Sequence, residues 1–137
     1  MSNDSRTRVA IMLLAGAVVL ATQTLVTAQQ PAVQRKVLLQ QDLTIPGYQA
    51  VLVSVEIPVG GREGRHTHPG SVLVHVEEGA LTLDYEGKPT VTYKVGESFY
   101  VEPDKIHEGI NKGNTPIKAI ATFIVEKGKP LTTQEQK

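Results

Sequence analysis

The most informative stretch of this sequence spans residues 60–70 and reads Gly-Gly-Arg-Glu-Gly-Arg-His-Thr-His-Pro-Gly. Within it, His66 and His68 lie two positions apart, so both side chains point to the same face of an extended chain. Neutral imidazole is a common ligand of zinc, copper, iron and nickel. The two histidines are therefore candidate ligands of one metal ion, although a His-x-His pair alone is as compatible with a surface or structural role.

On both sides of this stretch, apolar residues recur at every second position and are interrupted by Gly, Pro and Asn. A period of two with a break roughly every 8–12 residues is typical of a β-sandwich or barrel. The expected strands cover residues 51–57, 72–76, 81–85, 91–95, 99–101 and 117–125. The pattern predicts an all-β domain, but it does not distinguish a jelly-roll barrel from an immunoglobulin-like sandwich.

His107 is the candidate third ligand, because it follows a turn at residues 103–106 and is expected on a further short strand, distant in sequence from His66 and His68. The alternative is a solvated or hydrogen-bonded loop residue. His75 has the opposite parity to the valines around it, so it is expected to face away from whatever those valines face. We therefore leave His75 out of the candidate ligand set.

These residues resemble the two sequence motifs of the small single-domain cupins. Residues 60–70 look like the start of the first motif, Gly-x5-His-x-His, and Gly79 falls where that motif ends. Gly96, His107 and Asn111 stand at the mutual spacing of the second motif. Two motifs in the right order are a much stronger signal than either motif alone.

The resemblance covers the chain from about Tyr48 to Pro130. It implies an all-β double-stranded β-helix (jelly-roll) barrel, often dimeric, that holds one divalent metal ion inside on His66, His68 and His107. The family uses iron, manganese, nickel, zinc or copper, and the sequence does not say which. The expected organisation is a leader and first strand at residues 29–40, the barrel at 41–130 and a polar, frayed tail at 131–137.

Two positions depart from the family pattern. Val72 stands where the family commonly has a glutamate ligand. A three-histidine site with open positions, a substitute carboxylate from elsewhere, and a lost site all remain as interpretations. Asp104 stands where the motif usually has glycine, a minor change because aspartate tolerates turn conformations better than most residues.

The N-terminal 28 residues are typical of a secretory signal peptide. Arg6 and Arg8 precede an uncharged apolar run at residues 9–21, and Val26-Thr27-Ala28 offers small residues at the cleavage site. An uncleaved membrane anchor is the alternative, but the run is shorter than the roughly 20 apolar residues that span a bilayer. The expected location is therefore the periplasm or the outside of the cell, with no stable membrane anchor.

Charge and cysteine content exclude several classes of function. The chain has 14 basic and 14 acidic side chains and no cysteine. A near-neutral protein has no broad attraction for nucleic acid, and thiol chemistry and disulfides are excluded. The expected partner is a small-molecule ligand or substrate, and the exposed strand edges favour a homodimer.

The leading functional hypothesis is a small metal-dependent enzyme, dioxygenase-like or isomerase-like, that acts on a small oxygen-bearing molecule. The three histidines would hold the metal, Val72, Val74 and Val76 would form an apolar wall, and Glu63 is the candidate for moving protons. A non-catalytic binding or sensing module and a metal-free structural barrel are the rivals, because the fold does not fix function.

Overall fold

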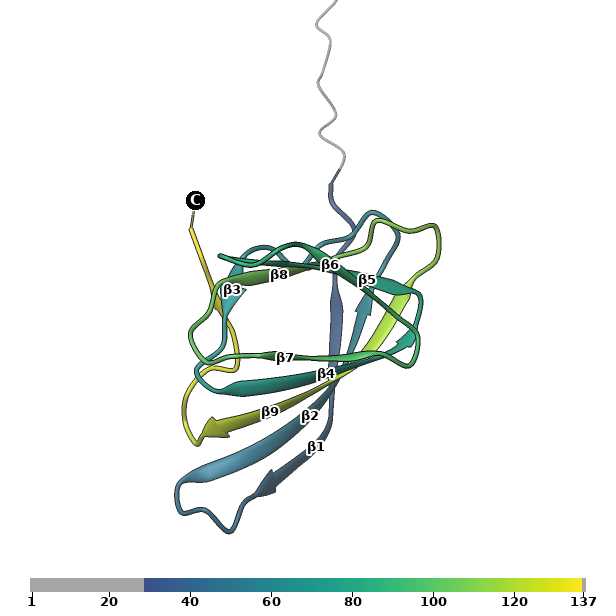
Figure 1. Cartoon of the computed structure of the whole chain (residues 1–137). Coiled ribbons are helices and arrows are strands. Elements are labelled where there is room, and N and C mark those ends of the chain that lie inside the picture. The colour runs from purple at the N-terminus through teal and green to yellow at the C-terminus, as the bar shows by residue number, and fades with distance from the viewer. Residues whose placement is uncertain (1–28, 137) are drawn as a thin grey trace, which may run out of the picture.

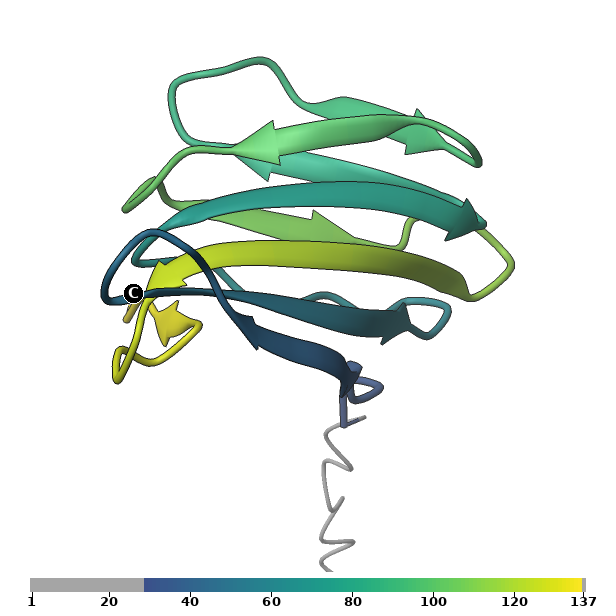
Figure 2. The same cartoon turned by 90° about the horizontal axis from the view of Figure 1, so that it is seen from below.

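The computed structural model describes residues 29–136, which form ten β-strands and no helix. The strands are β1 (Gln34–Asp42), β2 (Tyr48–Ile57), β3 (His66–Thr67), β4 (Ser71–Glu78), β5 (Ala80–Tyr85), β6 (Val91–Lys94), β7 (Ser98–Val101), β8 (His107–Ile110), β9 (Ile117–Glu126) and β10 (Thr133–Gln134). They make two five-stranded antiparallel sheets in the orders β1-β2-β9-β4-β7 and β10-β3-β8-β5-β6. Figures 1 and 2 show the two sheets facing each other around a common interior.

The barrel is built on the period-two pattern of its longest strands. In β2 and β9 every second residue is buried, and the two strands pair over ten positions from Tyr48↔Glu126 to Ile57↔Ile117. Ile57 and Ile117 are fully buried. Each such side chain contributes about 1.5–3 kcal/mol through removal of its apolar surface from water. The all-β jelly-roll expectation is confirmed, and β2, β4, β5, β6, β7 and β9 correspond to the strands expected from the sequence.

The first strand, β1, lacks the alternating burial of β2 and β9. All nine residues of β1 are exposed, and the strand is held by its ladder with β2, from Gln34↔Glu56 to Asp42↔Gln49.

The expected signal peptide lies outside the described residues. Within residues 29–136, no helix has the length and hydropathy of a membrane span.

The C-terminal segment is more ordered than its polar composition predicts. Thr133 and Gln134 form β10, which pairs with β3. The amide of Glu135 donates to the carbonyl of Arg65 at 2.9 Å, and Leu131 packs against the core. Backbone pairing does not depend on apolar side chains, so composition alone did not predict it.

Two loop residues position the chain around His107. Asp104 has a positive φ of 58°, and its amide donates to the carbonyl of His68 at 2.8 Å. Asn111 is buried, and its side-chain amide donates to the carbonyls of Ile57 and Thr115, each at 2.9 Å. The left-handed conformation explains how aspartate replaces glycine at position 104, and the hydrogen bonds of Asn111 hold the loop that follows β8.

Candidate metal centre

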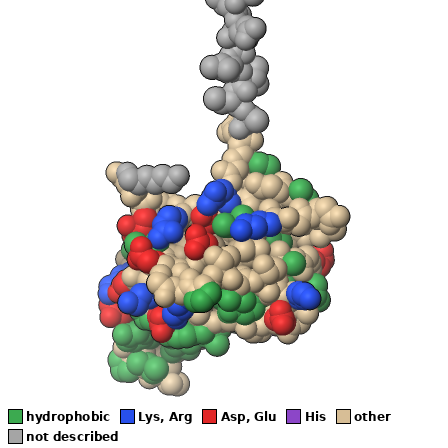
Figure 3. Space-filling model, turned by 45° about the horizontal axis from the view of Figure 1, so that its top comes forward, with side chains coloured by type: hydrophobic (Ala, Val, Ile, Leu, Met, Phe, Trp, Pro, Cys, Tyr) green, Lys and Arg blue, Asp and Glu red, His purple; other side chains and the backbone are tan. Residues whose placement is uncertain are grey.

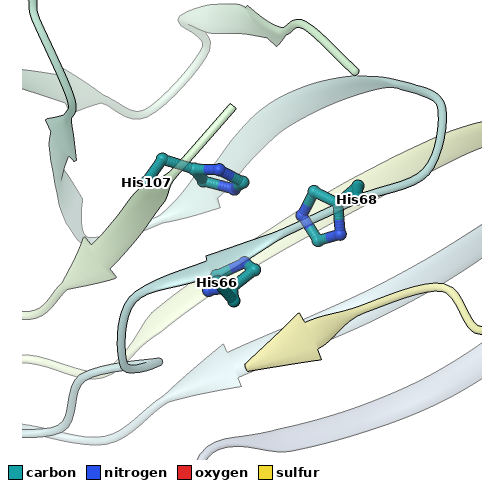
Figure 4. Close-up of side chains that lie close together, drawn as sticks. All are labelled: His66, His68 and His107. Carbon is teal, nitrogen blue, oxygen red and sulfur yellow. The ribbon is translucent and has the colours of Figure 1, made fainter. Parts of the chain in front are cut away.

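The structure brings His66, His68 and His107 together inside the barrel (Figure 4). His66 lies on β3 and pairs directly across the ladder with His107, the first residue of β8. His68 follows β3 by one residue. The ring centroids are 4.3 Å apart for His66 and His107 and 4.8 Å apart for the other two pairs. All three side chains are buried, with at most 5 % exposed, so these histidines are not surface residues.

Each of the three rings is held by a hydrogen bond from Nδ1 to a backbone carbonyl. The acceptors are Gly64 O for His66 at 2.7 Å, Leu131 O for His68 at 2.8 Å and Lys105 O for His107 at 2.9 Å. A carbonyl oxygen only accepts, so Nδ1 carries the hydrogen, and in the neutral ring Nε2 keeps its lone pair. This arrangement fixes the tautomer and orientation of histidines that ligate metals through Nε2.

Burial keeps two of the histidines neutral. Burial is the main cause that lowers the pKa of His68 to about 3 and that of His107 to about 4, and the nearby His66 acts in the same direction. The hydrogen bonds to Leu131 O and Lys105 O oppose this shift but do not cancel it. Both rings are therefore uncharged at neutral pH, which is the state that a metal ion requires.

An apolar wall faces the histidines across a small cavity. Val72 and Val74 of β4 and Phe123 of β9 line it, and its volume is about 40 Å³. Phe123 lies 5.0 Å from His68 in an edge-on contact, and Tyr85 stacks on His107 at 6.0 Å. Val72 stands where the sequence resemblance implies a glutamate ligand, but it is 1 % exposed and presents only methyl groups to the cavity. Val76 is buried but is not among the lining residues.

Besides these residues, the charged side chains of Arg35 and Glu63 line the cavity. Glu63 accepts a hydrogen bond from Arg35 at 2.9 Å and another from the amide of Gly109 at 3.2 Å. Glu63 lines the cavity but does not belong to the cluster of donor atoms, which are within 4.8 Å of one another. Among residues 29–136, no carboxylate joins the three histidines, so the structure does not supply the substitute ligand considered from the sequence.

The donor set fits a single divalent ion. It offers three uncharged nitrogen lone pairs, whose rings are oriented by backbone hydrogen bonds. With bonds of about 2.0–2.1 Å, two nitrogens on one ion are at most about 4.2 Å apart. The donor atoms of the three histidines lie within 4.8 Å of one another, close to this limit.

The remaining histidine behaves as parity predicts. His75 is exposed on the outer face of its sheet and shares a hydrogen bond of 2.8 Å with Ser98. On the face shown in Figure 3, basic and acidic side chains are interspersed and no histidine is visible.

Sequence reasoning missed several contributors to the site, among them Arg35, Phe123, the carbonyl of Leu131 and Thr132. The alternation of β9 could have identified Phe123, because it lies on the same buried face as Ala121 and Val125. The other three come from the two ends of the domain. No local pattern shows that these ends meet the histidines.

Comparisons with known proteins agree on the fold. The cupin-domain family model matches residues 53–131. A conserved protein with a double-stranded β-helix domain from Klebsiella pneumoniae is similar with a TM-score of 0.63 and 17% identity, over 80% of this chain and 90% of that chain. A cupin-like protein from Thermotoga maritima has a TM-score of 0.63 and 20% identity, over 77% of each chain.

A third similar structure is an oxalate oxidase in complex with the substrate analogue glycolate, with a TM-score of 0.55 and 20% identity. It matches over 61% of this chain and 45% of that chain. At these identities the likeness shows the fold alone. The comparison with curated proteins found no match.

Proposed function

We propose that this chain, which belongs to the cupin-domain family, holds one divalent metal ion on Nε2 of His66, His68 and His107 and is a small metal-dependent enzyme. The observation that carries the proposal is the set of three Nδ1–H···O=C bonds, which orient three buried imidazoles with Nε2 free. A structural role alone gives no reason for three buried rings to converge beside a cavity. The all-nitrogen donor set favours zinc, copper, iron or nickel over manganese.

The substrate that suits this site is a small oxygen-bearing molecule. A bound divalent ion supplies Lewis acidity and polarises an oxygen of the substrate. Val72, Val74 and Phe123 keep the facing side of the cavity apolar and leave coordination positions open. A single water needs roughly 10–15 Å³ on the same measure, so the cavity of about 40 Å³ accepts only a few heavy atoms beside the ion.

The reaction class we favour is dioxygenase-like or isomerase-like chemistry on such a molecule. Glu63 is the carboxylate that would move a proton, since it lines the cavity and its side chain is only 15% exposed. The similarity in fold to an oxalate oxidase makes small carboxylates sensible first compounds to screen.

A non-catalytic small-ligand-binding protein is the alternative. It is favoured by the engagement of Glu63 with both Arg35 and the Gly109 amide, which leaves no free acid–base group among the described cavity residues. Turnover assays with iron-, nickel-, zinc- and copper-loaded protein on two- to four-carbon hydroxy and keto acids separate the two functions. Product formation that is lost in Glu63→Gln supports the enzyme, whereas saturable binding without product supports the binder.

We also propose that the protein is exported and loses residues 1–28. The support is the order of basic start, short apolar run and small residues before Gln29. Intact-mass measurement of protein from the periplasmic fraction of a bacterial host is expected to show a chain beginning at Gln29. A full-length chain found only with membranes would contradict this and favour an anchor.

A further inference from the structure

Arg35 is the one described side chain lining the histidine cavity that carries a permanent positive charge. It lies on β1 directly opposite Val55, and Val55 faces the interior. Cross-strand neighbours project to the same face of a sheet. The guanidinium therefore reaches the cavity from an edge strand whose other residues serve no part of the site described above.

The ion pair of Arg35 differs from a second arginine–glutamate pair next to it. Glu108 is buried and binds Arg62 through both carboxylate oxygens, with a further bond from the Gly64 amide. That pair is internally satisfied and does not line the histidine cavity. Arg35 makes a single hydrogen bond to Glu63, although a guanidinium has five N–H donors. Its remaining donors, on a side chain 39% exposed, are open to a ligand.

The place of Glu63 is built into the backbone. A Cβ at Gly109 would lie 2.5 Å from Oε2 of Glu63, so the missing side chain makes room for the carboxylate. Gly109 also follows His107 by two residues on β8, on the same face. Glu63 is thereby fixed beside the histidines, and it fixes one edge of the Arg35 guanidinium in turn.

The charge of the histidine site calls for an anion. Three neutral imidazoles leave the full double charge of a bound ion uncompensated, because Val72 replaces the usual carboxylate ligand. Arg35 and Glu63 cancel each other. An anionic ligand is the group that neutralises such a cavity.

We propose that Arg35 binds the carboxylate of the substrate, and that the substrate class is a small carboxylate with a second oxygen on the adjacent carbon. This rests on the proposed metal site, since the second oxygen and one carboxylate oxygen chelate the ion while Arg35 holds the outer carboxylate oxygen. Besides its proposed part in moving a proton, Glu63 orients the guanidinium through its hydrogen bond. The small cavity beside the histidines favours the smallest acids of this class.

The test is a pair of titrations with glycolate and with glycolamide, its uncharged analogue of nearly equal size. Cobalt-loaded full-length protein is titrated and followed by its visible absorption and by calorimetry. Glycolate is expected to bind at least tenfold more tightly than glycolamide. Arg35→Gln should weaken glycolate binding at least tenfold, leave glycolamide and cobalt binding unchanged, and remove the preference, with Arg35→Lys intermediate because it loses the planar fork.

Arg65→Gln is the matched control. Arg65 is a similarly exposed arginine that pairs with Asp84 and Glu86 and does not line the cavity, so its loss should change glycolate binding less than twofold. Equal binding of glycolate by wild type and Arg35→Gln, or equal losses in Arg35→Gln and Arg65→Gln, would overturn the proposal. Thermal melting of each variant checks that it folds.

The same titrations on metal-free protein separate this inference from the metal site. If cobalt fails to bind but an Arg35-dependent preference for glycolate persists, the metal proposal fails and the anion site stands. If cobalt binds but the preference is absent, the anion site fails and the metal site stands. No preference in either form refutes the role of Arg35.

Discussion

The two walls of the cavity have opposite chemistry although both are made of strands. The histidine wall consists of His66 on β3, His68 directly after β3 and His107 on β8. Each of these rings is hydrogen-bonded to a backbone carbonyl. The facing wall comes from β4 and β9 and is apolar, with Val72 and Phe123 paired across the ladder. All candidate ligands therefore lie on one side, and the other side leaves the coordination sphere open.

The difference shows how a common fold produces an unusual site. The histidine wall orients its rings through hydrogen bonds to backbone carbonyls. The apolar wall contributes burial, which keeps His68 and His107 neutral. One wall thus supplies the ligands and the other sets their charge state, and each can be tested by changing it alone.

The largest effect is expected from acid on the metal-free protein. The pKa values of His68 and His107 are about 3 and about 4 in the folded state and about 6.5 in an unfolded chain. Below pH 6.5 the unfolded chain takes up protons that the folded chain does not, so stability falls as the pH drops. At pH 5 each histidine removes about 2 kcal/mol, or on the order of 4 kcal/mol together.

Urea denaturation of metal-free protein at pH 7.5 and pH 5 measures this loss. His68→Leu removes one of the two titrating groups and should show about half of the pH dependence. The exposed His75→Ala should show the wild-type dependence. Equal stability of the wild type at the two pH values would mean that the apolar wall does not hold these rings neutral.

The next effect comes from placing a ligand on the apolar wall. Val72→Glu restores a carboxylate facing the histidines, and is expected to tighten metal binding about 10- to 100-fold, or about 1.4–2.7 kcal/mol. The gain should be larger for manganese than for zinc, because carboxylates suit manganese better. Competitive titration with a chelating dye measures both affinities.

Val72→Ala is the control for this change, since it also removes the valine but adds no ligand. It should leave metal affinity unchanged and destabilise the fold by cavity formation. Val72→Glu without metal should also be less stable, because it buries an unpaired carboxylate, and metal should restore the stability. A Val72→Glu protein with unchanged metal affinity would show that position 72 does not face the ion.

The smallest effect is expected at the contact between the walls. Phe123→Leu removes the edge-on aromatic contact with His68 but keeps an apolar side chain. The loss should be about 1 kcal/mol of unfolding free energy, from the aromatic pair and incomplete packing. Metal affinity should fall less than threefold, as calorimetry would detect; a larger fall would mean that Phe123 helps to orient His68.

Much of this architecture was predictable because its determinants are local. Alternation in residues 51–57 and 117–125 predicts strands with one buried face, and the spacing of His66, His68 and His107 predicts their convergence through a known motif. Position 104 needed a residue that tolerates positive φ, and aspartate met that need.

The remainder depends on contacts between distant parts of the chain. Arg35 belongs to a strand with nine exposed residues, which carries no pattern that aims one of them into the barrel. The acceptor for His68 is a backbone carbonyl at Leu131, a group that every residue has. Such contacts follow from how the two ends of the domain pack, which no local pattern in the sequence shows.

The most direct measurement is elemental analysis of the protein purified without chelators, beside His66→Ala/His68→Ala and His75→Ala. We predict close to one equivalent of zinc, copper, iron or nickel in the wild type and in His75→Ala, and none in the double variant. Wild-type protein without metal even after reconstitution, or a double variant that keeps its metal, would contradict the account. The first of these results would identify Val72 as the mark of a lost site.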